Sequence, residues 1–251
     1  MGSHNQSTET RIAATCLVAF AFLLFGMVIF EAIMSAALEA QKLTWERDFL
    51  QKSKLRHVMP YFLNYLVIGG VGLFGTVGLA QVYGSSHRRI TAEVVKLAGL
   101  AYFAINYWLW AAMWVVQYKI TLLTDVPTNP PQWLMQAFKS SDAFWSLAGW
   151  GGQGPAIVLF LGLAWLLSRG ARLLPRSAAA AFLVMGVVHF VMLVYVGLHG
   201  AGLDNTSHGF AFLLDMTMAF GRIVAFLLAG AALYTEKGIF ARSVSSRTRV
   251  R

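Results

Sequence analysis

Long apolar stretches alternate with short polar ones along the whole chain. A helix of about 20 mainly apolar residues is long enough to cross a hydrocarbon core of roughly 30 Å. The pattern therefore predicts an all-α, polytopic membrane protein, built as a bundle of six transmembrane helices. We expect one integral membrane domain over 1–251, with a basic tail at 237–251 and spans at about 11–38, 59–83, 93–122, 144–168, 177–200 and 209–236.

The connections between these stretches are polar and contain turn-forming residues. Glycine, proline, asparagine, aspartate or serine gather at 84–86, 125–131 and 204–207, as is typical of loops. Two connections also repeat apolar residues at helical spacing, at 39–57 and 132–139. We expect short amphipathic helices there, lying on the membrane surface. An interfacial anchor is the simpler interpretation of both, and a substrate lid is the alternative.

The composition supports a bilayer as the solvent. The chain is 57% hydrophobic and 12% charged, whereas average soluble domains carry about 25% charged residues. The formal net charge of +9 comes mainly from loops and the C-terminus, where basic residues set membrane topology and contact anionic lipid. No nucleic-acid partner is expected. Cys16 is the single cysteine, which excludes an intramolecular disulfide.

The basic residues predict the orientation. With six spans both termini lie on one side of the membrane, and that side receives more lysine and arginine than the other. The positive-inside rule then places both termini in the cytoplasm. Without an organelle-targeting signal, we expect a bacterial plasma membrane. The basic residues on the terminal side are Arg11, Arg88, Arg89, Lys96, Arg169, Arg172 and Arg176, together with those of the tail.

Polar residues within the apolar stretches are the candidates for function. An ionisable side chain costs several kcal/mol in hydrocarbon unless it is paired or faces water, so such residues are expected to point into the bundle. We interpret them as a candidate ligand-binding set, and assign no catalytic residue and no metal ligand. The set is Glu31, Asn106, Gln153, His189, Asp215 and Arg222.

The last stretch has the sharpest pattern. His208, Asp215 and Arg222 recur every seven residues, which places them on one face of a helix. Because helical side chains lean toward the N-terminus, Arg222 can reach back toward Asp215. Two interpretations stay open. The polar faces enclose a cavity open to the outside, or Arg222 bridges Asp215 and Glu31 and locks the helices together.

Small residues mark two further features. Gly72, Thr76 and Ala80 form a small-residue face suited to close helix contact, within the chain, with a second copy or with other membrane subunits. The glycine-rich segment 149–155 ends in a proline. It is either a break in the fourth span or a close-packed helix start. Tyr102, Asn106 and Trp110 share one stripe of the third span.

The sequence does not identify a chemical reaction or a cofactor. Only His189 lies deep among the histidines, so a haem held by two histidines is not expected, and no catalytic or nucleotide-binding motif is present. The favoured hypothesis is binding or transport of a small polar or anionic solute in an outward-facing cavity near Arg222. The alternatives are an accessory subunit of a membrane complex, or a membrane enzyme that uses Asp215, Glu31 and His189.

Overall fold

The structure is all helical over the part of the chain that it describes. This computed structural model describes residues 2–40, 55–84, 88–112, 151–168, 170, 172–199 and 208–247, and no strand occurs among them. Of the predicted amphipathic helices, 41–54 and 132–139 lie outside this part. The helices are α1 (Gly2–Ala40), α3 (Leu55–Tyr83), α4 (Arg89–Phe103), the π-helix η2 (Ala104–Leu109), Gly151–Leu167, α7 (Leu173–His199) and α8 (His208–Arg247).

Five of the helical segments are long and apolar enough to cross a membrane, and one further apolar helix is shorter. The short helix is Gly151–Leu167. The chain is therefore a multi-pass, all-α membrane protein, as the sequence pattern predicts. The predicted span ends at 113–122 and 144–150 lie outside the described residues. The five long segments are Thr8–Phe30, Asn64–Tyr83, Arg89–Ala112, Leu173–Leu198 and Leu213–Thr235.

These helices are apolar on the outside as well as the inside. In α1, Leu17 and Phe20 are fully buried, whereas Phe22 on the opposite face is 64% exposed. In α7, Phe182 is fully buried and the neighbouring Leu183 is 51% exposed. A soluble helix turns polar residues outward. Large apolar side chains on both faces indicate that one face packs into the bundle and the other meets lipid.

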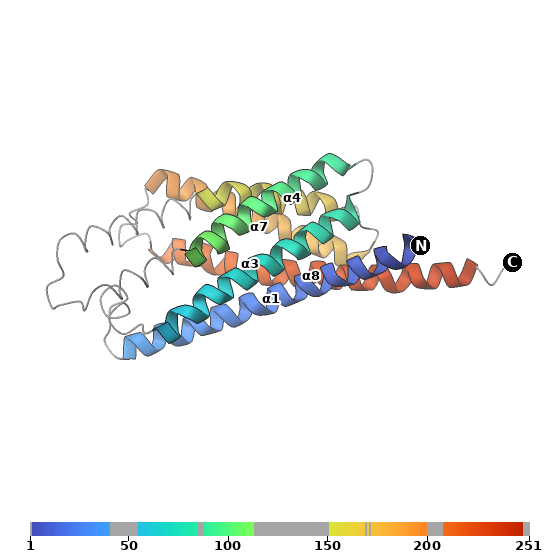
Figure 1. Cartoon of the computed structure of the whole chain (residues 1–251). Coiled ribbons are helices and arrows are strands. Elements are labelled where there is room, and N and C mark those ends of the chain that lie inside the picture. The colour runs from blue at the N-terminus through green and yellow to red at the C-terminus, as the bar shows by residue number, and fades with distance from the viewer. Residues whose placement is uncertain are drawn as a thin grey trace.

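The helices lie side by side along one direction, and both termini are at the same end of the bundle (Figure 1). Helix α1 packs against α3 and α8, α7 packs against α8, and α3 packs against α4 and η2. The interior is an aromatic cluster in which most ring pairs meet edge to face, the favoured geometry for such rings. Its fully buried members are Phe20, Tyr102, Phe103, Phe160, Phe182 and Phe226.

The small-residue face of α3 is buried within this chain. Thr76 and Ala80 are fully buried, and a Cβ built on Gly72 would lie 2.7 Å from the Phe20 ring and in collision with the Phe103 ring. Close helix contact is what this pattern predicts. Its neighbours are Phe20 on α1 and Phe103 on α4, so the close contact forms between helices of this chain.

Arginines tie the helix ends together at the end of the bundle that holds the termini. Arg88 donates to the carbonyl of Leu166 (2.7 Å), and Arg172 donates to the carbonyl of Thr235 (3.2 Å). Leu166 is in the last turn of its helix, where the carbonyls lack intrahelical donors, so Arg88 satisfies one of them and complements the helix dipole. The Arg88 contact aligns the end of Gly151–Leu167 with the start of α4, and the Arg172 contact joins the start of α7 to α8 at Thr235, 12 residues before α8 ends.

The packing of α3 predicts opposite effects for two alanine substitutions. Gly72→Ala adds a methyl group against two buried rings, which costs about 1–3 kcal/mol and exceeds the gain of about 1 kcal/mol in helix propensity. Gly70→Ala is the control, because a Cβ there has no atom within 4 Å. Thermal unfolding in detergent should show a lower midpoint for Gly72→Ala and an equal or higher one for Gly70→Ala. Equal midpoints would contradict the packing.

Candidate functional site

A π-helix interrupts the third span and sets the position of two polar side chains. The segment Ala104–Leu109 follows α4 without a gap, and helix continues to Ala112. The wider turn of a π-helix places residues five apart on one side, and Tyr102 and Tyr107 are both buried. The Asn106 side-chain amide donates to the Tyr102 carbonyl (3.0 Å). Short π-segments within α-helices occur frequently at functional sites.

Arg222 on α8 reaches into the bundle and contacts α4. Its Nε donates to the Met218 carbonyl (2.9 Å), and its Nη1 donates to the Tyr102 hydroxyl (3.0 Å). The side chain thus bends back by one turn, in the direction expected for a helix. It then meets an aromatic hydroxyl of another helix. Arg222 is partly buried, and Tyr102 is fully buried.

The guanidinium keeps donors that the protein does not use. An arginine side chain carries five N–H donors. Within the described residues, only one on Nε and one on Nη1 form hydrogen bonds. The other three leave a positively charged fork with free hydrogen-bonding capacity. This geometry suits the oxygens of a carboxylate or a phosphate, which arginine binds through two parallel hydrogen bonds.

His189 and Gln153 form the second polar pair. His189 is 3% exposed, and its Nδ1 lies 2.6 Å from Gln153 Oε1. The imidazole stacks on Phe160, with centroids 5.1 Å apart, and meets the Tyr102 ring edge-on at 6.4 Å. Because an amide oxygen can only accept, Nδ1 carries the hydrogen. In the neutral ring Nε2 is then an acceptor.

Two buried polar atoms in this region, one of them on His189 itself, have no hydrogen-bond partner among the described residues. They are His189 Nε2 and the Tyr107 hydroxyl oxygen. An unsatisfied buried polar group costs about 1–3 kcal/mol, and a native protein retains few of them. The Tyr102 ring, which contacts both His189 and Tyr107, places these atoms beside the Arg222 contact. Both atoms therefore lie in the region of the Arg222 contact.

The two pairs lie at the same depth. Arg222 is 13 residues before Thr235, and Gln153 is 13 residues before Leu166, so each lies about 20 Å from the end of the bundle that Arg172 and Arg88 cap. Gly152 admits the Asn106 side chain at this level, because a Cβ at position 152 would lie 2.6 Å from the amide. Helix begins by Gly151 and continues through Pro155, and 149–150 lie outside the described residues.

The sequence-derived set separates into two groups. Asn106, Gln153, His189 and Arg222 converge in the interior. Asp215 is exposed, and among the described residues it makes no ion pair with Arg222. The direct Arg222–Asp215 contact expected from the spacing is absent among the described residues, where the guanidinium donates to the Tyr102 hydroxyl instead. Glu31 lies on α1, and its side chain is outside the described part.

Sequence reasoning did not identify the aromatic partners. Tyr102 was expected only as part of a stripe with Asn106, not as the acceptor for Arg222. Phe160 and Tyr107 were not singled out, because an apolar helix offers many aromatic residues of equal standing. No residue pattern in the sequence predicts the π-helix that places the Tyr107 side chain in the interior of the bundle. The one signal in the sequence that points to Tyr102 is its position, four residues before the intramembrane Asn106.

Comparison with known proteins identified no related protein. No protein-family model matches the sequence, and searches of curated proteins and of solved structures gave no match.

The Arg222–Tyr102 contact predicts a difference between two tyrosine substitutions. Tyr102→Phe removes the Nη1 acceptor of a partly buried cation and leaves only the Met218 carbonyl, and we expect it to lower the free energy of unfolding by about 1.5–3 kcal/mol. Tyr234→Phe is the matched control. It removes a hydrogen bond of 2.7 Å to the Thr15 hydroxyl at an exposed position, which costs at most about 1 kcal/mol. Reversible unfolding in mixed detergent measures both, and a smaller loss for Tyr102→Phe would contradict the assignment.

Proposed function

We propose that the chain binds or transports a small anionic solute within the helix bundle, with Arg222 as the anion-binding group. The observation that carries the proposal is the partly buried guanidinium, which donates to one carbonyl and one aromatic hydroxyl and retains three donors that no described residue accepts. A cation in the interior of a membrane protein lowers the stability of the fold unless it is paired. A role in binding an anion explains why the position is not occupied by an apolar residue.

His189 refines the class of solute. Its Nε2 is buried without a hydrogen-bond partner in the described region, and the bond from Nδ1 to Gln153 makes Nε2 an acceptor in the neutral ring. A solute that satisfies both groups carries an anionic oxygen for Arg222 and a hydrogen-bond donor for His189. A small hydroxy acid or amino acid has this combination. The Tyr107 hydroxyl can accept or donate a third hydrogen bond.

We further propose a topology of six spans in a bacterial plasma membrane, with both termini cytoplasmic. The helix Gly151–Leu167 is then the described part of the fourth span. Support comes from the common end of the two termini (Figure 1) and from Arg88, Arg172 and Arg176 at that end. In a hydrocarbon core of roughly 30 Å, a site about 20 Å from the basic end lies in the outer half. Its solute would enter from outside.

The two alternative functions have less support. An accessory subunit was expected to present the glycine face of α3, and that face is buried in this chain. An acid–base enzyme was expected to pair His189 with Asp215. However, His189 bonds to Gln153, and Asp215 is exposed. Neither alternative is carried by an observation of comparable weight.

The proposal predicts a specific pattern of solute stabilisation. The purified protein would be heated with 2-hydroxypropionate, propionate, inorganic phosphate or neutral glycerol. We expect the hydroxy acid to raise the unfolding midpoint more than propionate does, and glycerol to have no effect. Arg222→Gln should abolish the response to every anion. His189→Phe, which keeps the ring stack on Phe160, should remove only the preference for the hydroxy acid.

Asp215→Asn is the control for this experiment, because it changes a charge on the same helix at an exposed position. It should respond to each solute as the native protein does. The proposal fails if no anion of the series shifts the native midpoint, or if Arg222→Gln responds like Asp215→Asn.

A further inference from the structure

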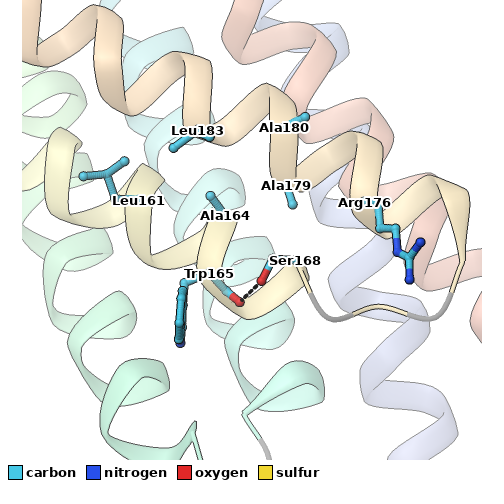
Figure 2. Close-up of a pocket in the computed structure, with 8 residues that line it drawn as sticks. All are labelled: Leu161, Ala164, Trp165, Ser168, Arg176, Ala179, Ala180 and Leu183. Atoms are coloured by element: carbon cyan, nitrogen blue, oxygen red, sulfur yellow. Dashed lines mark hydrogen bonds between the residues drawn. The ribbon is translucent and has the colours of Figure 1, made fainter.

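A groove runs along the outer surface between Gly151–Leu167 and α7, away from the polar site. Its volume is about 490 Å³. Leu161, Ala164 and Trp165 line one wall, and Ala179, Ala180 and Leu183 line the other; Ser168 and Arg176 lie at one end (Figure 2). The alanines make the groove, because their methyl groups fill less space between the helices than the leucines beyond them.

The apolar part of the groove belongs to the membrane-spanning surface. Trp165 is 55% exposed and Leu183 is 51% exposed, and both lie on apolar helices of the bundle. From Arg176 to Leu183 the groove extends by about 10 Å along α7. An apolar surface of this kind in a membrane protein is covered by acyl chains unless another protein covers it.

The other end of the groove is basic. Arg176 is exposed, and its Nε donates to the Gly170 carbonyl (3.1 Å), which orients the guanidinium and leaves both Nη groups available. Arg172 lies directly before α7, and the first turn of α7 contains no acidic residue. Positive side chains and the N-terminal end of a helix dipole together favour an anionic phosphate.

We propose that this groove is a binding site for an anionic phospholipid. The phosphate binds at Arg176, and one acyl chain lies along Ala180 and Leu183. Charge complementarity selects this occupant, since only an amphiphile with an anionic head and an apolar tail matches both the basic end and the apolar wall. The site is independent of the solute site at Arg222, which is formed by different residues in the interior.

The test compares two lipids with identical acyl chains, phosphatidylglycerol and phosphatidylcholine, added to the delipidated protein in mild detergent. Thermal unfolding is measured at increasing lipid concentrations. Arg176→Gln removes the charged end, and Ala180→Trp fills the groove from an exposed position. Arg89→Gln is the matched control, because Arg89 is an exposed arginine adjacent to Arg88 at the same end of the bundle and does not line the groove.

We expect phosphatidylglycerol to stabilise the native protein and Arg89→Gln at lower concentration than phosphatidylcholine does. For Arg176→Gln, the concentration for half-maximal effect should rise about tenfold, the loss expected for one charged hydrogen bond. Ala180→Trp should abolish the preference. Soluble glycerol 3-phosphate should not replace the lipid, because it lacks the acyl chain.

Several outcomes would overturn the proposal. Equal stabilisation by the two lipids would show that the site does not recognise an anionic headgroup. An Arg176→Gln response equal to that of Arg89→Gln would show the same. An unchanged response of Ala180→Trp would show that no acyl chain lies in the groove. If Arg176→Gln does not fold, the Ala180→Trp variant alone tests the proposal. A smaller particle for Ala180→Trp in size-exclusion chromatography would assign the groove to a protein contact.

Discussion

A charged guanidinium among packed membrane helices is the constraint on which the rest of the interior depends. Arg222 cannot lose its proton at ordinary pH, so the bundle must provide oxygen acceptors at its depth. The Tyr102 hydroxyl and the Met218 carbonyl do so. The π-helix after α4 adds Asn106 and Tyr107 to this region. Polar groups from α4, η2 and α8 thus meet at one depth, inside an otherwise aromatic core.

Much of this architecture follows from the sequence, because the cost of burying a backbone or a charge in hydrocarbon leaves few alternatives. Apolar stretches of sufficient length have to be helices, since a helix satisfies its own backbone hydrogen bonds. Arg222 turns inward for the same reason, and Gln153 meets His189 because both are polar residues of apolar helices. The small residues of α3 allow close contact, as their spacing indicates.

The features that the sequence does not predict depend on contacts between residues that are far apart in the sequence. The seven-residue spacing allows Arg222 to approach Asp215, but it contains no information about Tyr102, which lies 120 residues away. A phenol hydroxyl in the interior accepts a hydrogen bond from Arg222 without the desolvation penalty of a second charge. In the same way, the glycine pattern predicts contact without naming its partner, and no local signal distinguishes a π-turn from an α-turn.

In the proposed function, Arg222 is retained to bind a solute and not to hold the helices together. Replacing both partners at once, Arg222→Met with Tyr102→Phe, tests it most directly, because no unpaired charge remains. The account predicts a free energy of unfolding within about 1 kcal/mol of the native value, or higher, with stabilisation by anions lost. A loss of more than about 3 kcal/mol, or an unchanged response to anions, would contradict it.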